Sequence, residues 1–79
     1  MQRYCVDKGN IGYIIRDTQR NLPLPFTYFS RQYADEACMR FNEGGHVAVA
    51  EYYYVHKVAG NGYNITYKNW MDKNKDMFK

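Results

Sequence analysis

The chain has 79 residues, of which 46% are hydrophobic and 24% are charged, a composition typical of a globular protein rather than a disordered one. This length excludes a second domain and any large nucleotide-binding or barrel fold, because so short a chain can bury only one small core. The net charge of +3 is well below the concentrated positive charge of most phosphate-binding proteins. We therefore expect residues 1–79 to form a single domain, with residues 71–79 as a frayed, charged tail.

The sequence carries no signal for export or membrane insertion. Residues 1–7 lack the apolar run of a secretory signal, and no apolar run approaches the ~20 residues of a membrane span. We therefore expect a soluble, cytoplasmic protein without a membrane partner. In a reducing cytoplasm, Cys5 and Cys38 are expected to be free, buried thiols rather than a disulfide.

The N-terminal third is expected to form a β-hairpin. Residues 3–8 alternate in polarity, with Tyr4 and Val6 on one face, and residues 12–17 are rich in side chains that favour strands. The glycine and asparagine between them tolerate the positive φ angles of a tight turn. Residues 18–25 follow as an extended connection, because their two prolines lack backbone donors and disfavour a helix.

The next segment has the signals of an amphipathic helix over residues 31–43. Ser30 is a good N-cap, and the two glycines at positions 44 and 45 are expected to end the helix, one of them in the left-handed conformation. A single apolar stripe with helical spacing runs through Ala34, Ala37, Cys38 and Phe41. This is the stripe that should cover the sheet.

The C-terminal part is expected to form a second hairpin. Residues 46–59 are rich in tyrosine and valine, which favour strands. The pair Asn61-Gly62 favours a type I′ turn, and a return strand would then cover residues 63–70.

These elements occur in the order β-β-α-β-β, which predicts the α+β class. We expect a two-layer sandwich, in which a mostly antiparallel four-stranded sheet has one helix packed on one face. The opposite face of the sheet would be open to water or to a partner.

No arrangement of residues points to a reaction or a bound metal. Cys5, Cys38, His46 and His56 have ligand types that suit zinc, but they lack the short paired spacings of zinc sites. Cys38 falls on the apolar helix stripe, where a thiol usually serves as a small hydrophobic side chain. We therefore expect a non-enzymatic protein with no catalytic residue, no metal site and no cofactor.

The aromatic residues of the predicted second hairpin form the main candidate site. In the register set by the turn, two rings and two lysines share the open face of the sheet. Three carboxylates on the predicted helix form a second, acidic surface. The expected partner-contact residues are Tyr53, Trp70, Lys57 and Lys68 on the sheet, and Asp35, Glu36 and Glu43 on the helix.

A surface that mixes rings and lysines suits more than one kind of partner. Tyrosine and tryptophan are enriched in the hot spots of protein interfaces, which indicates a protein-binding module. The same mixture can stack unpaired bases while lysines hold phosphates, so a single-stranded nucleic-acid binder is the main alternative. A structural subunit of a homo-oligomer, such as a homodimer, also stays open, because the last predicted strand could expose an edge. The tyrosines could also be purely structural.

In its size, single-domain build, lack of catalytic signatures and interaction-prone surface, the chain resembles the small orphan proteins of phages and mobile elements. Anti-CRISPR and other counter-defence inhibitors belong to this group. The resemblance implies an inhibitor in the host cytoplasm that binds a host protein or ribonucleoprotein complex and blocks it by steric occlusion. The net charge of +3 departs from the strongly acidic members that mimic nucleic acid.

Overall fold

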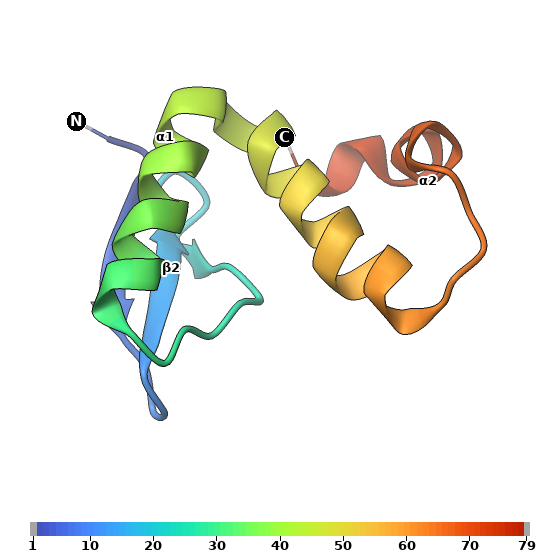
Figure 1. The fold of residues 1–79 in the computed structure, drawn as a ribbon. Coiled ribbons are helices and arrows are strands. Elements are labelled where there is room, and N and C mark those ends of the chain that lie inside the picture. The colour runs from blue at the N-terminus through green and yellow to red at the C-terminus, as the bar shows by residue number, and fades with distance from the viewer. Residues whose placement is uncertain (1, 79) are drawn as a thin grey trace. The chain divides into compact units, whose positions relative to one another are not determined.

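The computed structural model describes residues 2–78, so positions 1 and 79 lie outside the described residues. The chain divides into two compact units, residues 1–43 and residues 44–79, which are called the N-terminal and the C-terminal unit below. Figure 1 shows that the strands lie in the N-terminal unit and that α2 lies in the C-terminal unit.

The N-terminal unit contains a three-stranded antiparallel sheet. Its strands are β1 (Tyr4–Lys8), β2 (Tyr13–Asp17) and β3 (Leu22–Pro23), in the order β1-β2-β3. In β1 and β2, Tyr4 lies opposite Asp17 and Lys8 lies opposite Tyr13. The predicted first hairpin is therefore confirmed, and the short β3 lies within the predicted extended connection.

The first part of α1 (Arg31–Tyr53) covers one face of this sheet (Figure 1). It begins as predicted, with the Ser30 hydroxyl accepting the Gln32 N–H at 3.2 Å. The rings of Tyr4 and Phe41 meet edge to face with centroids 5.9 Å apart. All four residues of the predicted apolar stripe are buried, namely Ala34, Ala37, Cys38 and Phe41.

Side chains of α1 also satisfy the open edge of β1 at Tyr4. Tyr4 donates its backbone N–H to Asn42 Oδ1 at 2.8 Å, and its carbonyl accepts from Asn42 Nδ2 at 2.9 Å. The Cys38 thiol donates to the same carbonyl at 3.1 Å. Exposed strand edges invite pairing with other chains, so these contacts protect β1 from edge-to-edge association.

A buried ion pair fixes the far end of the hairpin. Asp17 is almost fully buried and accepts from Arg3 Nε at 2.9 Å and from Arg3 Nη2 at 2.8 Å. It also accepts the backbone N–H of Gln19 at 3.1 Å. The hydrogen bonds from Arg3 lower the pKa of Asp17, and this effect exceeds the opposing effect of burial.

The C-terminal half corrects the predicted fold. The α+β class and the antiparallel sheet are confirmed, but the β-β-α-β-β order and the four-stranded sheet with one helix are wrong. The first predicted C-terminal strand is instead helical, and the second is irregular over residues 63–66 and helical from Tyr67 onward. Here α1 continues to Tyr53 and is followed by a π-helix (Tyr54–Val58), a 3-10 turn (Ala59–Asn61), α2 (Tyr67–Asn74) and a second 3-10 turn (Lys75–Phe78).

The physical reason lies in spacing and in the two glycine positions. Val49, Ala50 and Val58 are buried while residues 51–57 are all at least partly exposed, a pattern without the strict alternation of a strand, which the strand preference of the intervening tyrosines concealed. Gly45 has non-helical backbone angles (φ 69°, ψ −157°), so a break does occur near the predicted end, but the helix resumes beyond it. Gly62 (φ 80°) ends the 3-10 turn with its N–H bonded to the Ala59 carbonyl, so it does not make a hairpin turn.

The lowered pKa of Asp17 gives a pH-dependent prediction. Above the ordinary pKa of an aspartate, about 4, the ionised pair with Arg3 stabilises the fold, and this contribution is lost as the pH falls through the lower folded pKa. Asp17→Asn should lower the free energy of unfolding at pH 7 by about 1–3 kcal/mol. Urea unfolding between pH 7 and pH 2 should show the wild type and the variant converging in acid, whereas a constant difference would contradict this.

The covered edge of β1 gives a second prediction. Asn42→Ala removes both hydrogen bonds to Tyr4 and should cost about 1–3 kcal/mol. The variant should also self-associate, because the edge of β1 is uncovered. Light scattering should then show an average mass that rises with protein concentration. Asn10→Ala, at an exposed position of the hairpin turn, is the matched control and should change the free energy of unfolding by less than about 0.5 kcal/mol. A monomeric, equally stable Asn42→Ala chain would contradict the protective role.

Candidate interaction surfaces

Trp70 of α2 lies at the centre of an aromatic cluster in the C-terminal unit. Its ring stacks on Tyr53 at 5.8 Å with an interplanar angle of 14°. Tyr54 and Tyr67 lie against it at 5.6 Å and 6.2 Å. Trp70 is only 7% exposed, so it is a core residue of this unit. Burial raises the pKa of Tyr67, as expected for a ring at the margin of this cluster.

The structure therefore brings together the two rings predicted to form a contact surface, but not on a sheet. The described residues of the C-terminal unit contain no strand, so the open Tyr/Trp/Lys sheet face is not formed. The exposed edge of the last predicted strand is also missing, because α2 starts at Tyr67. The nucleic-acid and homo-oligomer alternatives lose the features on which they were based.

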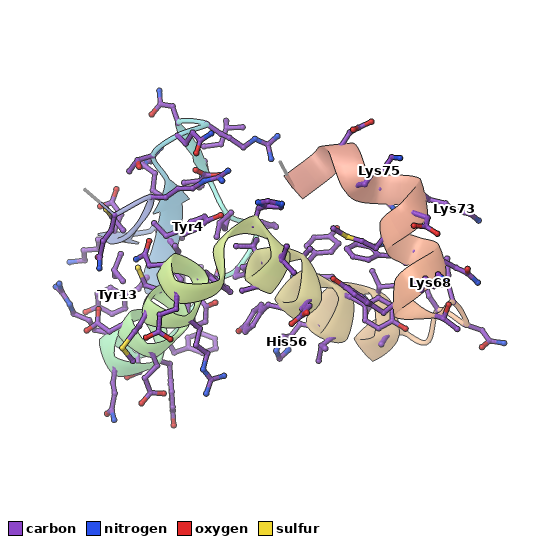
Figure 2. The ribbon with its side chains drawn as sticks, turned by 90° about the horizontal axis from the view of Figure 1, so that it is seen from above. Tyr4, Tyr13, His56, Lys68, Lys73 and Lys75 are labelled. Atoms are coloured by element: carbon purple, nitrogen blue, oxygen red, sulfur yellow. The ribbon has the colours of Figure 1, made fainter. Side chains whose placement is uncertain are left out.

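The two predicted contact lysines lie on different helical elements. Lys57 is exposed on the π-helix, and Lys68 is exposed on α2. Figure 2 shows Lys68 and Lys73 along α2, with Lys75 in the turn that follows. Within residues 2–78, neither Lys57 nor Lys68 takes part in an ion pair. Both ammonium groups are available to solvent or to a partner.

The predicted acidic surface carries mixed charge. Asp35, Glu36 and Glu43 are all exposed on α1. Arg31 lies one turn before Asp35 and approaches it at 3.8 Å, and Arg40 lies between the two glutamates in sequence. These arginines offset part of the negative charge, so the surface has no concentrated acidic field.

Three strongly exposed apolar side chains lie at one end of the N-terminal unit, and the sequence had not pointed to them. Phe29 is 86% exposed, Tyr33 is 64% exposed and Ile11 is 72% exposed. Phe29 and Tyr33 flank the start of α1, and Ile11 lies in the β1–β2 turn at the same end (Figure 1). We call Ile11, Phe29 and Tyr33 the aromatic tip.

Backbone contacts hold the aromatic tip in place. Tyr13 and Tyr28 exchange backbone hydrogen bonds of 2.8 Å and 2.9 Å, which ties the end of the hairpin to the segment before α1. Gly12 (φ 86°) lies so close that a Cβ there would come within 2.4 Å of the Tyr28 carbonyl oxygen and 3.5 Å of Phe29 Cα. The exposed Phe29 therefore projects from a fixed backbone. Its position directly before the Ser30 cap would by itself suggest packing against the first turn of α1, so the sequence holds no local signal for its exposure.

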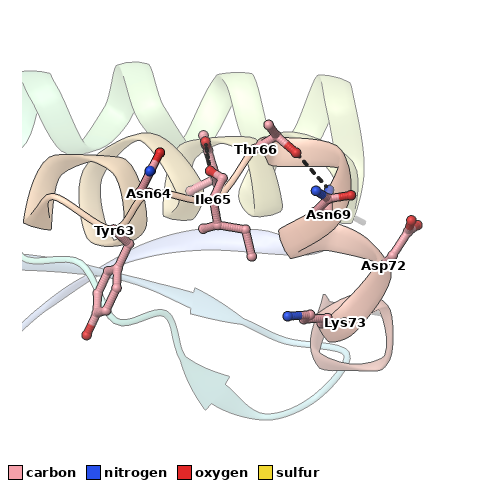
Figure 3. Close-up of a pocket in the computed structure, with 8 residues that line it drawn as sticks. Tyr63, Asn64, Ile65, Thr66, Asn69, Asp72 and Lys73 are labelled. Atoms are coloured by element: carbon pink, nitrogen blue, oxygen red, sulfur yellow. Dashed lines mark hydrogen bonds between the residues drawn. The ribbon is translucent and has the colours of Figure 1, made fainter.

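A pocket of about 690 Å³ opens in the C-terminal unit (Figure 3). Thr66 caps α2 by accepting the Asn69 N–H at 3.3 Å, and the Tyr54 hydroxyl donates to the Ile65 carbonyl. These two hydrogen bonds fix the segment that enters α2. The lining residues come from the π-helix, from this segment and from one face of α2: Tyr54, Tyr63, Asn64, Ile65, Thr66, Asn69, Asp72 and Lys73.

Metal-ligating side chains, the two cysteines and the apolar character of the helices bear on catalysis and on membrane insertion. Among residues 2–78, no cluster of three or more histidine, cysteine or acidic side chains is placed to hold a metal ion. Both cysteines are free thiols as predicted, and burial raises the pKa of the Cys38 thiol, which makes it a poor nucleophile at neutral pH. The prediction that Cys5 is buried is wrong, because its side chain is exposed on the face of β1 opposite that of Tyr4. None of the described helices combines the length and apolar character needed to cross a membrane.

No family model, curated protein or solved structure matches the chain.

The central place of Trp70 gives a prediction about stability. Trp70→Ala should lower the free energy of unfolding by about 3–5 kcal/mol, because it leaves a large cavity among the surrounding tyrosines. Far-UV circular dichroism should lose helical signal, and amide hydrogen exchange should become fast across residues 67–74. Lys68→Ala on the exposed side of α2 is the control and should change little. Retained helicity and protection in Trp70→Ala would contradict a core role for the ring.

Proposed function

We propose that this chain is a small non-enzymatic protein-binding module that docks through the aromatic tip and covers a surface of its partner. The observation that carries this proposal is the exposure of Phe29 at 86%, beside two further exposed apolar side chains. Isolated exposed apolar residues are ordinary, but a cluster containing an almost fully exposed phenylalanine marks an interaction site. Aromatic side chains are also enriched in protein interfaces.

The energetics favour docking at this end. Covering an apolar side chain of this size contributes about 1.5–3 kcal/mol, so the three tip residues together can anchor an interface. The backbone beneath Phe29 is already fixed by the Tyr13–Tyr28 bridge, so little backbone order has to be created on binding. A preorganised anchor of this kind suits a protein that acts by occupying a surface.

The charges around the aromatic tip indicate the chemistry of the partner. Lys8 is exposed at the end of β1 next to the turn that carries Ile11, and Arg31, two residues after Phe29, is exposed while also approaching Asp35 at 3.8 Å. An apolar patch bordered by carboxylates would complement this arrangement. A host protein or ribonucleoprotein complex blocked by steric occlusion, as in phage and mobile-element inhibitors, is the class of target that we propose.

Site-specific crosslinking tests this proposal. A photoreactive phenylalanine analogue placed at position 29 and activated in the native cells should give a discrete protein adduct. The same analogue at Leu22, an exposed apolar position of the same unit at 53%, is the matched control and should not. Phe29→Ser combined with Tyr33→Ser should remove the complex while changing the free energy of unfolding by less than about 1 kcal/mol, because both rings are exposed. An adduct with nucleic acid and none with protein, or equal labelling from positions 22 and 29, would contradict the proposal.

A further inference from the structure

The pocket of the C-terminal unit lies apart in sequence from the aromatic tip and has a different chemical character. Its volume of about 690 Å³ falls within the ~300–1,000 Å³ typical of small-molecule sites. Its wall combines aromatic rings with amide, hydroxyl, carboxylate and ammonium groups. We propose that this pocket binds a neutral saccharide.

The aromatic part of the wall offers a stacking surface. Tyr63 is 67% exposed and lies in the segment between Gly62 and Thr66. In Figure 3, Tyr63 and Lys73, which both line the pocket, lie on opposite sides of Ile65. A phenol ring presents a flat apolar face with a polar edge, which suits a ligand that has C–H groups on one side and hydroxyls around its rim.

The polar part of the wall is spread out and offers both donors and acceptors. Thr66, Asn69 and Lys73 follow one face of α2 over about 10 Å, given the 1.5 Å rise per helical residue. Each asparagine amide can donate and accept, as a sugar hydroxyl also does. Within the part of the chain that the structure describes, the side chains of Asn64, Asn69 and Lys73 make no hydrogen bond to protein. Their hydrogen-bond donors and acceptors are therefore available to a ligand.

The charge of the lining disfavours an anion. Lys73 is the one basic residue of the wall, and Asp72 offsets its charge. A phosphate needs several donors converging on a single point, whereas these groups are spaced along the helix. An extended, uncharged ligand with many hydroxyls matches both the spacing and the balance of charge.

Nuclear magnetic resonance tests the proposal on the full chain. Trisaccharides of glucose, mannose, galactose, xylose and N-acetylglucosamine are titrated separately, with inorganic phosphate as the charged probe. At least one sugar should shift the side-chain amide signals of Asn64 and Asn69 saturably, with a dissociation constant in the millimolar range. Phosphate should not.

Matched variants locate the binding. Asn69→Ala and Tyr63→Ala both change exposed side chains. Each should raise the dissociation constant for the sugar that binds by about tenfold or more, which corresponds to a loss of roughly 1.4 kcal/mol of binding free energy. Asn10→Ala in the N-terminal unit should leave the affinity unchanged. The proposal is overturned if none of the sugars shifts these signals, if only phosphate does, or if neither pocket variant weakens binding. None of these results bears on the aromatic tip, because a tip variant such as Phe29→Ser leaves every pocket residue in place.

Discussion

The close approach of α1 to β1 is the constraint on which the N-terminal unit depends. Three small side chains, Ala34, Ala37 and Cys38, form most of the buried stripe and let the helix lie directly against the sheet. Because the helix lies this close, the Asn42 amide can reach both the backbone N–H and the carbonyl of Tyr4. The Cys38 thiol can reach the same Tyr4 carbonyl. The same contact therefore buries the apolar face of the sheet and satisfies the polar edge of β1, which in a small domain would otherwise be open to association.

This packing also explains why apolar side chains can be exposed at one end of the unit without disturbing the fold. The start of α1 and the β1–β2 turn are joined by the Tyr13–Tyr28 bridge, and Gly12 lets the two backbones come close. Phe29, Tyr33 and Ile11 are therefore held by backbone contacts rather than by burial of their own side chains. A small protein gains no stability from leaving these apolar groups in water, which is why we propose a docking role for them.

The sequence predicts the N-terminal unit well because its local signals agree with one another. The alternation around Tyr4, the cap at Ser30 and the stripe ending at Phe41 each indicate the observed element. The C-terminal half was mispredicted because strand preferences depend strongly on context, and tyrosines pack equally well around a buried tryptophan between helices. Tyr53 and Trp70 do lie face to face, but within a helical core, so their side chains are unavailable as an open sheet face. The aromatic tip was missed because the exposure of Phe29 depends on how the turn and the helix start meet in space.

The most direct test of the docking role compares the solvent accessibility of tip residues inside and outside the native cell. Hydroxyl-radical footprinting can be applied to the chain in its native cells and again after purification. If the aromatic tip is an interface, Phe29 and Tyr33 should be oxidised much less in cells than in the purified chain, while the exposed Leu22 and Val55 should react equally in both. Equal oxidation of Phe29 and Tyr33 in the two settings would contradict an occupied interface at this end of the N-terminal unit.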